Sequence, residues 1–344
     1  MINNLQYISA FTTAAVVCGA VTPLMKRVAI KRGIVDSPNQ SHKTHLNSVP
    51  YLGGIAIIIA VFTTALLGVL TNRNAESYLA LALSIFVPSL FLGLIGLIDD
   101  IRQLSPASRF FAQTISGLFT ASLLVFTSTV GSPTGISSLD FAITILWIVG
   151  ITNSINFFDN HDGGASGAVA IASLGLFVLA ASSGQYLIAG LAVVLSGSCF
   201  GFLFWNRNPA RIYMGDAGAL FLGTMIASLL VRLEPNPINR LASFSVPILV
   251  LALPILDTTV AVLSRLKRGV SPFQGGKDHL SHRLVRLGLS RKQTALALWT
   301  LTGYFVFLAI IISNISYNLE GVVTLVGISS WLGLFLFFFR LSDE

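Results

Sequence analysis

Charged residues are scarce in this sequence, because Asp, Glu, Lys and Arg make up only 10% of its 344 residues. Soluble globular domains carry about 25%, so this chain has too little charge to cover a water-facing surface, and a large soluble protein is excluded. Cysteine is also rare. Cys18 and Cys199 both lie in apolar segments, which indicates small buried side chains and not zinc ligands. The sequence has no low-complexity tract and no clear internal repeat.

Long apolar segments are what the sequence has instead. Hydrophobic residues make up 54% of the chain, and segments of about 20 apolar residues, enough to cross a bilayer as helix, recur along it. The first opens with Met-Ile-Asn-Asn and lacks a basic n-region, which indicates a retained span and not a signal peptide. We expect an all-α integral membrane protein whose residues 1–344 form a single polytopic domain. It has about 11 transmembrane helices, at about 5–25, 51–71, 77–98, 109–129, 139–156, 164–180, 185–205, 214–231, 241–263, 294–313 and 320–339.

The basic residues predict the orientation of these spans. With the N-terminus outside, all of the 21 lysines and arginines except Arg73, Arg232 and Arg240 fall on the cytoplasmic side, as the positive-inside rule requires. The longest basic cytoplasmic loop covers residues 264–293. All five histidines and most carboxylates fall on the same side, although neither set the orientation. We therefore expect the functional loops to face the cytoplasm.

Adjacent carboxylates end one apolar segment in "GLIGLIDDIRQ". Asp99 and Asp100 repel each other at the C-terminal end of a helix, where the macrodipole disfavours negative charge. One interpretation is a solvated pair neutralised by Arg102 and Arg109. The alternative is a cation site, since Asp216 in "YMGDAG" lies on the same predicted side. Oxygen ligands of this kind suit a hard ion such as Mg²⁺.

Two further polar motifs lie on that side. In "NFFDNHDGGASG", Asn153 and Asn156 share a helix face, and Asp159 and Asp162 repeat their three-residue spacing. This pattern favours a ligand site, with a polar turn as the alternative.

The second motif is "DHLSHRL". It places His279, His282 and Arg283 together as donors to phosphate oxygens, with a basic loop facing lipid headgroups as the alternative. Asp257 lies within an apolar segment, either as a functional carboxylate or as a partner of Arg265.

The ordered motifs resemble those of the polyprenyl-phosphate N-acetylhexosamine-1-phosphate transferases, glycosyltransferase family 4. "DDIRQLSPASR" is similar to DDxxxLxxxxK, with Arg109 in place of Lys. "NSINFFDNHDG" is similar to NxxNxxDxxDG, "NRNPARIYMGDAG" to NxxPAxxFMGDxG, and "DHLSHRL" to the HxHH motif. "DSPNQSHKTHLNSVPYLGG" and "PFQGGKDHLSHRL" favour the WecA/TagO-like members over the phospho-MurNAc-pentapeptide translocases. The chain departs from the family pattern at Asn160, where Gly is frequent, at Ala219, where Ser is usual, and at Ser281, which replaces the middle His.

The resemblance implies a Mg²⁺-dependent enzyme of a bacterial-type inner membrane, with Mn²⁺ as an alternative ion. It would transfer N-acetylhexosamine-1-phosphate, with GlcNAc-1-phosphate as the first choice, from a UDP-sugar to a polyprenyl phosphate such as undecaprenyl phosphate. UMP leaves, in the first membrane step of a cell-envelope glycan pathway. The partners are these two substrates and the bilayer, with a homodimer as an open alternative and no nucleic acid.

The resemblance also assigns roles to residues. Asp99, Asp100 and Asp216 would be catalytic and hold the metal. The substrate-binding residues would be Asn153, Asn156, Asp159, Asp162, Asn206, Arg109, His279, His282, Arg283 and His45.

Two other functions compete with this one. A transporter or flippase for an anionic solute or lipid-linked sugar predicts polar residues across the midplane and inverted repeats, and the sequence shows neither. A CDP-alcohol phosphotransferase requires the motif DGxxARxxN…GxxxDxxxD, which is absent.

Overall fold

The computed structural model describes residues 4–36, 48–71, 76–126, 134–237, 239–272 and 276–341, and these residues are almost wholly helical. The predicted all-α fold is confirmed. The helices are α1 (Asn4–Arg32), α2 (Gly53–Thr71), α3 (Glu76–Arg102), α4 (Pro106–Phe126), α5 (Ser137–Phe158), α6 (Gly164–Ser182), α7 (Tyr186–Asn206), α8 (Gly215–Leu230), α9 (Arg240–Val250), α10 (Ala252–Lys267), α11 (Leu280–Arg286), α12 (Arg291–Asn314) and α13 (Tyr317–Arg340).

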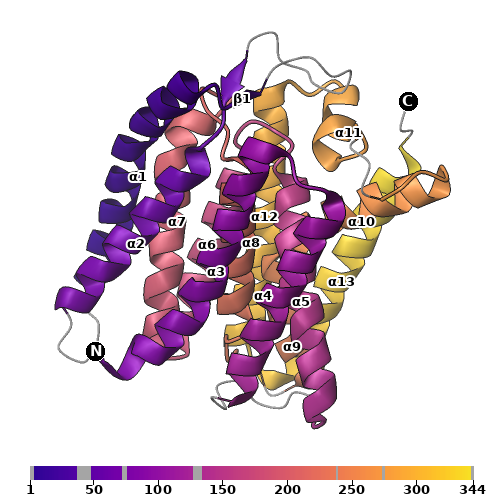
Figure 1. Ribbon diagram of the computed structural model, residues 1–344. Coiled ribbons are helices and arrows are strands. Elements are labelled where there is room, and N and C mark those ends of the chain that lie inside the picture. The colour runs from indigo at the N-terminus through magenta and orange to yellow at the C-terminus, as the bar shows by residue number, and fades with distance from the viewer. Residues whose placement is uncertain are drawn as a thin grey trace.

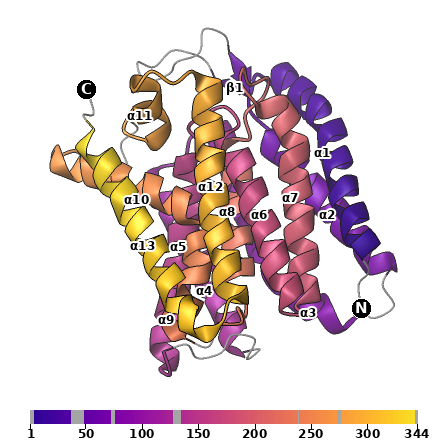
Figure 2. The same cartoon turned by 180° about the vertical axis from the view of Figure 1, so that it is seen from behind.

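The helices form a bundle of membrane dimensions. Within the described ranges, eight helices are long and apolar enough to cross a bilayer, or nine if α9 and α10 form one bent span. Most of them run in similar directions, side by side, in Figures 1 and 2. Large apolar side chains such as Leu70, Phe307 and Leu325 are exposed on the outside of the bundle, as lipid-facing residues are. The protein is a multi-pass membrane protein, and the total of about 11 spans stays a prediction.

Helix α8 lies at the centre of the bundle, packed against α2, α3 and α5. All of its residues except Asp216 are buried. A Cβ atom added to Gly54 in α2 would lie 2.2 Å from the backbone nitrogen of Gly218, and one added to Gly96 in α3 would lie 2.3 Å from the carbonyl oxygen of Asp216. Glycine therefore lets both helices approach the backbone of α8. This packing places the start of α8 beside the end of α3.

The span predicted over residues 241–263 is not one continuous helix. The segment is broken at Leu251 into α9 and α10, which are bent by 76°. Pro254 explains the position of the break, because it has no N–H to bond the carbonyl of Val250 and its ring would clash with that carbonyl. Beyond the bend, α10 runs out to the side of the bundle, below α11 in the view of Figure 1.

A short strand pair, which the sequence does not predict, lies at the end of the bundle that carries α11 (Figure 1). Strands β1 (Val35–Asp36) and β2 (Val49–Pro50) are antiparallel, with Val35 opposite Pro50. The backbone N–H of Tyr213 donates to the carbonyl of Pro50 over 2.9 Å. The pair thereby joins the segment before α2 to the segment before α8.

Candidate active site

A cavity of about 870 Å³ lies at the α11 end of the bundle. Carboxylates and amides from α3, α5 and α8 line one part of it, and basic residues between 276 and 291 line another. Of the residues predicted from the sequence, it brings together Asp99, Asp100, Arg109, Asn156, Asp159, Asp162, Asn206, Asp216, His279 and His282. Four separate segments of the chain therefore meet at one cavity.

The acidic wall is the part of the cavity lined by Asp99, Asp100, Asn156, Asp159 and Asp216, and Asp216 lies at its centre. It lies in the first turn of α8, and its Oδ1 accepts a hydrogen bond from Asn156 over 2.7 Å. The Nη1 atom of Arg109 lies 3.1 Å from Oδ2 of Asp216 and 3.0 Å from Oδ2 of Asp99. One guanidinium nitrogen thus bridges two carboxylates, so the space between Asp99 and Asp216 attracts a cation.

Asp100 has a different environment from its neighbour. Its two carboxylate oxygens accept the backbone N–H groups of Asp216, over 2.8 Å, and Ala217, over 3.1 Å. These are the free donors at the start of α8, where the helix dipole favours negative charge. Gly215 adopts a φ of +71°, and a Cβ atom there would lie 2.6 Å from Asp100 Oδ2. Asp100 therefore caps α8 and orients Asp216.

The segment after α5 divides its carboxylates between two positions. Burial, and then the charge of Asp216, raises the pKa of Asp159 to about 7. Asp162 instead holds the loop before α8, because its Oδ2 accepts from the side chain of Asn208 over 2.7 Å and from the backbone N–H of Ala210 over 3.1 Å. Asn206 is buried and joins the same loop to the start of α6. Asp162 and Asn206 thus shape the cavity wall.

His279 is held by a buried carboxylate. Its Nδ1 donates to Oδ2 of Asp257 over 2.7 Å, while its Nε2 accepts from Nη2 of Arg265 over 3.2 Å. The other oxygen of Asp257 accepts the N–H of Leu280, the first residue of α11. Asp257 therefore pairs with His279. Arg265, which was one of the two interpretations of Asp257 from the sequence, is not its partner.

Arg265 forms a bidentate pair with Asp278, with both N–O distances at 2.8 Å. Although burial raises the pKa of the Asp278 carboxyl, hydrogen bonds and charge from Arg265 outweigh it, and the pKa is lowered. Burial, and then the neighbouring His279, lowers the pKa of His282 to about 4. Burial also lowers the pKa of His161, whose Nε2 donates to the carbonyl of Arg291 over 2.8 Å. Both shifts favour the uncharged imidazoles of His161 and His282.

Two predicted substrate-binding residues are not brought to the cavity. Asn153 lies about one turn further than Asn156 from the cavity end of α5, and its side-chain nitrogen donates to Gln113 over 2.6 Å. Arg283 is 1% exposed, and its guanidinium donates to backbone carbonyls including that of Phe338 and to the hydroxyl of Ser264. Its position is structural and joins α11 to α10 and α13. His45 lies outside the described residues.

Several lining residues were not singled out from the sequence. They are Asp36, Tyr51, Gln103, Tyr213, Lys277, Arg286 and Arg291. The basic character of residues 264–293 was the available indication for the last three. Nothing local marks Asp36 and Tyr51, which reach the cavity through the strand pair.

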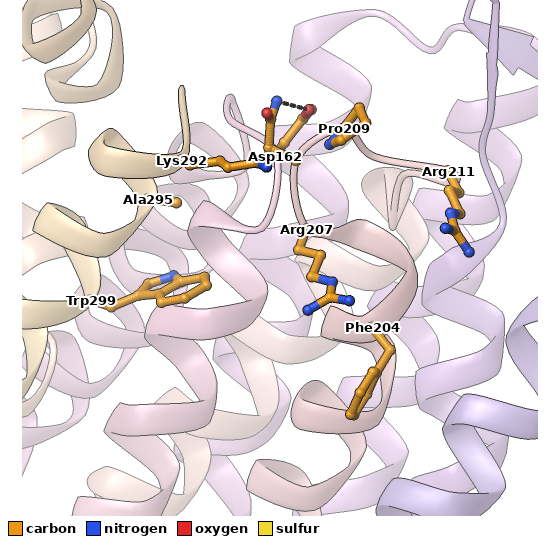
Figure 3. Close-up of a pocket in the computed structure, with 9 residues that line it drawn as sticks. Asp162, Phe204, Arg207, Pro209, Arg211, Lys292, Ala295 and Trp299 are labelled. Carbon is orange, nitrogen blue, oxygen red and sulfur yellow. Dashed lines mark hydrogen bonds between the residues drawn. The ribbon is translucent and has the colours of Figure 1, made fainter. Parts of the chain in front are cut away.

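A second pocket, of about 470 Å³, adjoins the first and shares Asp162 with it. Figure 3 shows Lys292 extending from α12 towards Asp162, with Arg207 beyond it. Phe204, Ala295 and Trp299 form its apolar part. Polar and basic side chains, Asp162, Lys292 and Arg207, thus extend from the cavity towards the outside of the bundle.

Comparison with known proteins gives several matches. The family model of glycosyl transferase family 4 matches residues 82–234. The chain is similar to a probable undecaprenyl-phosphate N-acetylglucosaminyl 1-phosphate transferase of Bacillus subtilis (strain 168), with 33% identity over 97% of this chain and 89% of the relative. It is 29% identical to a decaprenyl-phosphate N-acetylglucosaminephosphotransferase of Mycolicibacterium smegmatis, over 86% of this chain and 79% of the relative.

A phospho-N-acetylmuramoyl-pentapeptide-transferase of Chlamydia muridarum is 34% identical, but over only 59% of this chain and 70% of the relative. The N-acetylglucosamine transferases thus match more of the chain, in agreement with the predicted WecA/TagO-like subfamily. Since the similarity to the Bacillus enzyme extends over almost the whole length of both sequences, the chain belongs to glycosyl transferase family 4, a family of enzymes.

Proposed function

We propose that the protein transfers N-acetylglucosamine-1-phosphate from a UDP-sugar to a polyprenyl phosphate and releases UMP. The observation that carries the proposal is the composition of the cavity, in which clustered carboxylates face histidine, lysine and arginine at one end of a bundle of apolar helices. Both substrates carry phosphate, and one of them is anchored in lipid. A cavity at the membrane edge brings their phosphates together without removing the prenyl chain from the bilayer. The names of the Bacillus and Mycolicibacterium relatives describe a transfer of this kind.

The proposed reaction exchanges one phosphorus–oxygen bond for another. An oxygen of the lipid phosphate forms a bond to the phosphorus that carries the sugar. The bond from that phosphorus to the bridging oxygen of UDP breaks, and UMP leaves with the electron pair. Because the second pKa of a phosphate monoester is about 6, the attacking oxygen is already largely ionised near neutral pH. The protein therefore has to position the phosphates and balance their charge more than it has to remove a proton.

Mg²⁺ fits the acidic wall. No group of three or more His, Cys, Asp or Glu side chains in the described part of the chain is arranged to hold a metal. Mg²⁺, however, needs only one or two carboxylates when substrate phosphates and water complete its octahedron. Asp99 and Asp216 meet this requirement, since Arg109 already bridges them as a cation. When bound, Mg²⁺ would neutralise charge on the transferring phosphates.

The remaining roles follow from position. Asp100 orients Asp216 through the start of α8. Asn156 and Asp159 lie next to Asp216 in the wall and are placed to bind the nucleotide or the sugar. His279, His282 and the basic residues Lys277, Arg286 and Arg291 would bind the diphosphate, in place of the buried Arg283. The charge bias of the sequence supports a cavity that opens on the cytoplasmic side of the membrane.

The test is an assay of purified protein with undecaprenyl phosphate, Mg²⁺ and a panel of UDP-sugars, scored by UMP release. We expect turnover with UDP-N-acetylglucosamine and its loss in Asp216→Asn. Asp140→Asn is the matched control, because that carboxylate bonds Thr134 outside the cavity lining. No turnover with any donor would contradict the proposal and favour transport of an anionic solute. Full activity of Asp216→Asn would contradict the role of Asp216.

A further inference from the structure

Two departures from the family pattern are in contact in the structure. Asn160 stands where glycine is frequent, and Ser281 stands where the middle histidine of HxHH is usual. The hydroxyl of Ser281 donates a hydrogen bond to Oδ1 of Asn160. Both residues line the cavity, and Ser281 is only 2% exposed. Two changes separated by more than a hundred residues along the chain thus form one local structure.

The Asn160 carboxamide connects three parts of the site. Its nitrogen donates to the carbonyl of Phe157, at the end of α5, over 2.7 Å, and lies 3.5 Å from Oδ2 of Asp257. Asp257 is fully buried and accepts from Nδ1 of His279 and from the N–H of Leu280, both over 2.7 Å. Asn160 therefore contacts α11 directly through Ser281 and, more weakly, through the carboxylate that holds His279.

The two side chains are also complementary in size. Asparagine adds a carboxamide where glycine has no side chain, and serine lacks the imidazole ring of histidine. Because protein interiors are closely packed, a larger group at one of two touching positions requires a smaller one at the other. The hydroxyl of Ser281 contacts the carboxamide of Asn160, so the two side chains share one space.

Helix α11 depends on such contacts. It has only seven residues, and an isolated helix of this length is not stable in water. Its N-cap, His279, makes no side-chain capping bond, and Asp257 supplies an acceptor to Leu280 instead. The bond from Ser281 to Asn160 is a side-chain link between α11 and the segment after α5.

We propose that Asn160 and Ser281 are a matched pair of positioning residues, which together hold α11 against the end of α5 and thereby fix His279 and His282 at the cavity. The role of the two imidazoles rests on the proposed function. The pairing itself does not, since it concerns how one segment of the chain is held against another.

The test is a double-mutant cycle with Asn160→Gly, Ser281→His and the two combined. Asn160→Gly removes the acceptor of Ser281, and Ser281→His places a ring against the carboxamide, so each should lower kcat about tenfold. The double variant restores the size balance, so its kcat should exceed that of either single variant, with a coupling of about threefold or more. The midpoint of thermal unfolding in detergent should show the same order.

Two matched comparisons separate positioning from general stability. Ser281→Thr keeps the hydroxyl and should stay within about twofold of wild type, whereas Ser281→Ala should lose activity and raise KM for the UDP-sugar. Ser196→Ala removes a hydroxyl that is equally buried and donates to the carbonyl of Ala170 over 2.8 Å, outside the cavity lining. It should lower the unfolding midpoint and leave kcat and KM unchanged.

The outcomes are distinguishable. If the two single effects are independent in the double variant, so that the factors in kcat multiply and the shifts in unfolding midpoint add, the proposed pairing is wrong. If Ser281→Ala and Ser281→Thr behave alike, the hydrogen bond has no positioning role. If wild-type protein releases no UMP, the proposed function fails, and the cycle of unfolding midpoints still decides whether Asn160 and Ser281 are coupled.

Discussion

Asp99 and Asp100 should respond differently to the same substitution. Asp100 accepts two backbone N–H groups at the start of α8, over 2.8 and 3.1 Å. In Asp100→Asn, one side-chain oxygen remains as an acceptor, but the new NH₂ group faces a backbone N–H. Loss of an N-terminal cap costs about 0.5–2 kcal/mol, and loss of the charge at the helix dipole costs about 0.3–1 kcal/mol. We therefore expect a destabilisation of about 1–3 kcal/mol for Asp100→Asn.

Asp99→Asn should cost less. One oxygen of Asp99 accepts the N–H of Leu104, and an asparagine keeps that bond. The other oxygen pairs with Arg109, which is 31% exposed and keeps Asp216 as a second partner. Because Arg109 is partly exposed and keeps Asp216 as a partner, the substitution leaves no buried charge without a counter-ion, and its cost should stay below that of Asp100→Asn. The substitution should instead raise the Mg²⁺ concentration that UMP release requires, because it removes one of the two carboxylates proposed to hold the ion.

The assay is chemical denaturation of both variants and wild type in the same detergent without Mg²⁺, followed by UMP release over a range of Mg²⁺ concentrations. The stability order should be wild type and Asp99→Asn close together, with Asp100→Asn clearly lower. If Asp100→Asn unfolds at the wild-type midpoint, the capping role is wrong. If both variants shift the Mg²⁺ requirement equally, the division of roles between the two residues is wrong.

Three further predictions follow from the contacts. Gly54→Ala should prevent correct assembly, seen as loss of monodisperse protein in size-exclusion chromatography, since its Cβ atom would lie 2.2 Å from the backbone of Gly218. Arg265→Gln removes the bidentate partner of the buried Asp278 carboxylate but leaves Arg268, whose Nη2 lies 2.8 Å from Oδ2, so it should destabilise the protein by about 1.5–3 kcal/mol in denaturant titration, and no measurable effect would contradict the importance of the pair. His282 has a pKa lowered from 6.5 to about 4, so between these pH values the unfolded state binds more protons and stability falls as the pH falls. Wild type should lose about 1–2 kcal/mol more than His282→Gln between pH 6.5 and pH 5, and equal losses would refute this.

Local composition predicts the helices well and their geometry less well. Each of the eleven apolar segments expected from the sequence overlaps a helix of the structure. The segment 241–263 is mostly apolar, and its two prolines, Pro247 and Pro254, lie seven residues apart. A proline within a helix either bends it or breaks it, and only the surrounding packing decides which. Here the helix breaks before Pro254, whereas Pro247 lies inside α9.

The site shows a similar division. The motifs identify most of the residues that meet at the cavity, because oxygen and imidazole groups at the ends of apolar segments have few purely structural uses. Arg283 was grouped with His279 and His282 because it is their neighbour in the chain. Its acceptors include the carbonyls of Phe338 and Leu341, which lie at the C-terminal end of α13. No local pattern indicates such a partner, so adjacency in sequence assigned Arg283 to the wrong environment.

Helical geometry explains why the adjacent aspartates of "GLIGLIDDIRQ" have separate environments. Successive residues of an α-helix point about 100° apart around its axis, so Asp99 and Asp100 point in different directions from α3. Gly96 allows α3 to approach the backbone of α8, which brings one of these two directions onto the free N–H groups at the start of α8 and leaves the other directed at Arg109. Both carboxylates thereby act on Asp216, Asp100 through its backbone and Asp99 through a shared cation. Separating the pair by one inserted residue would turn one of them away and break this arrangement, although both aspartates would still be present.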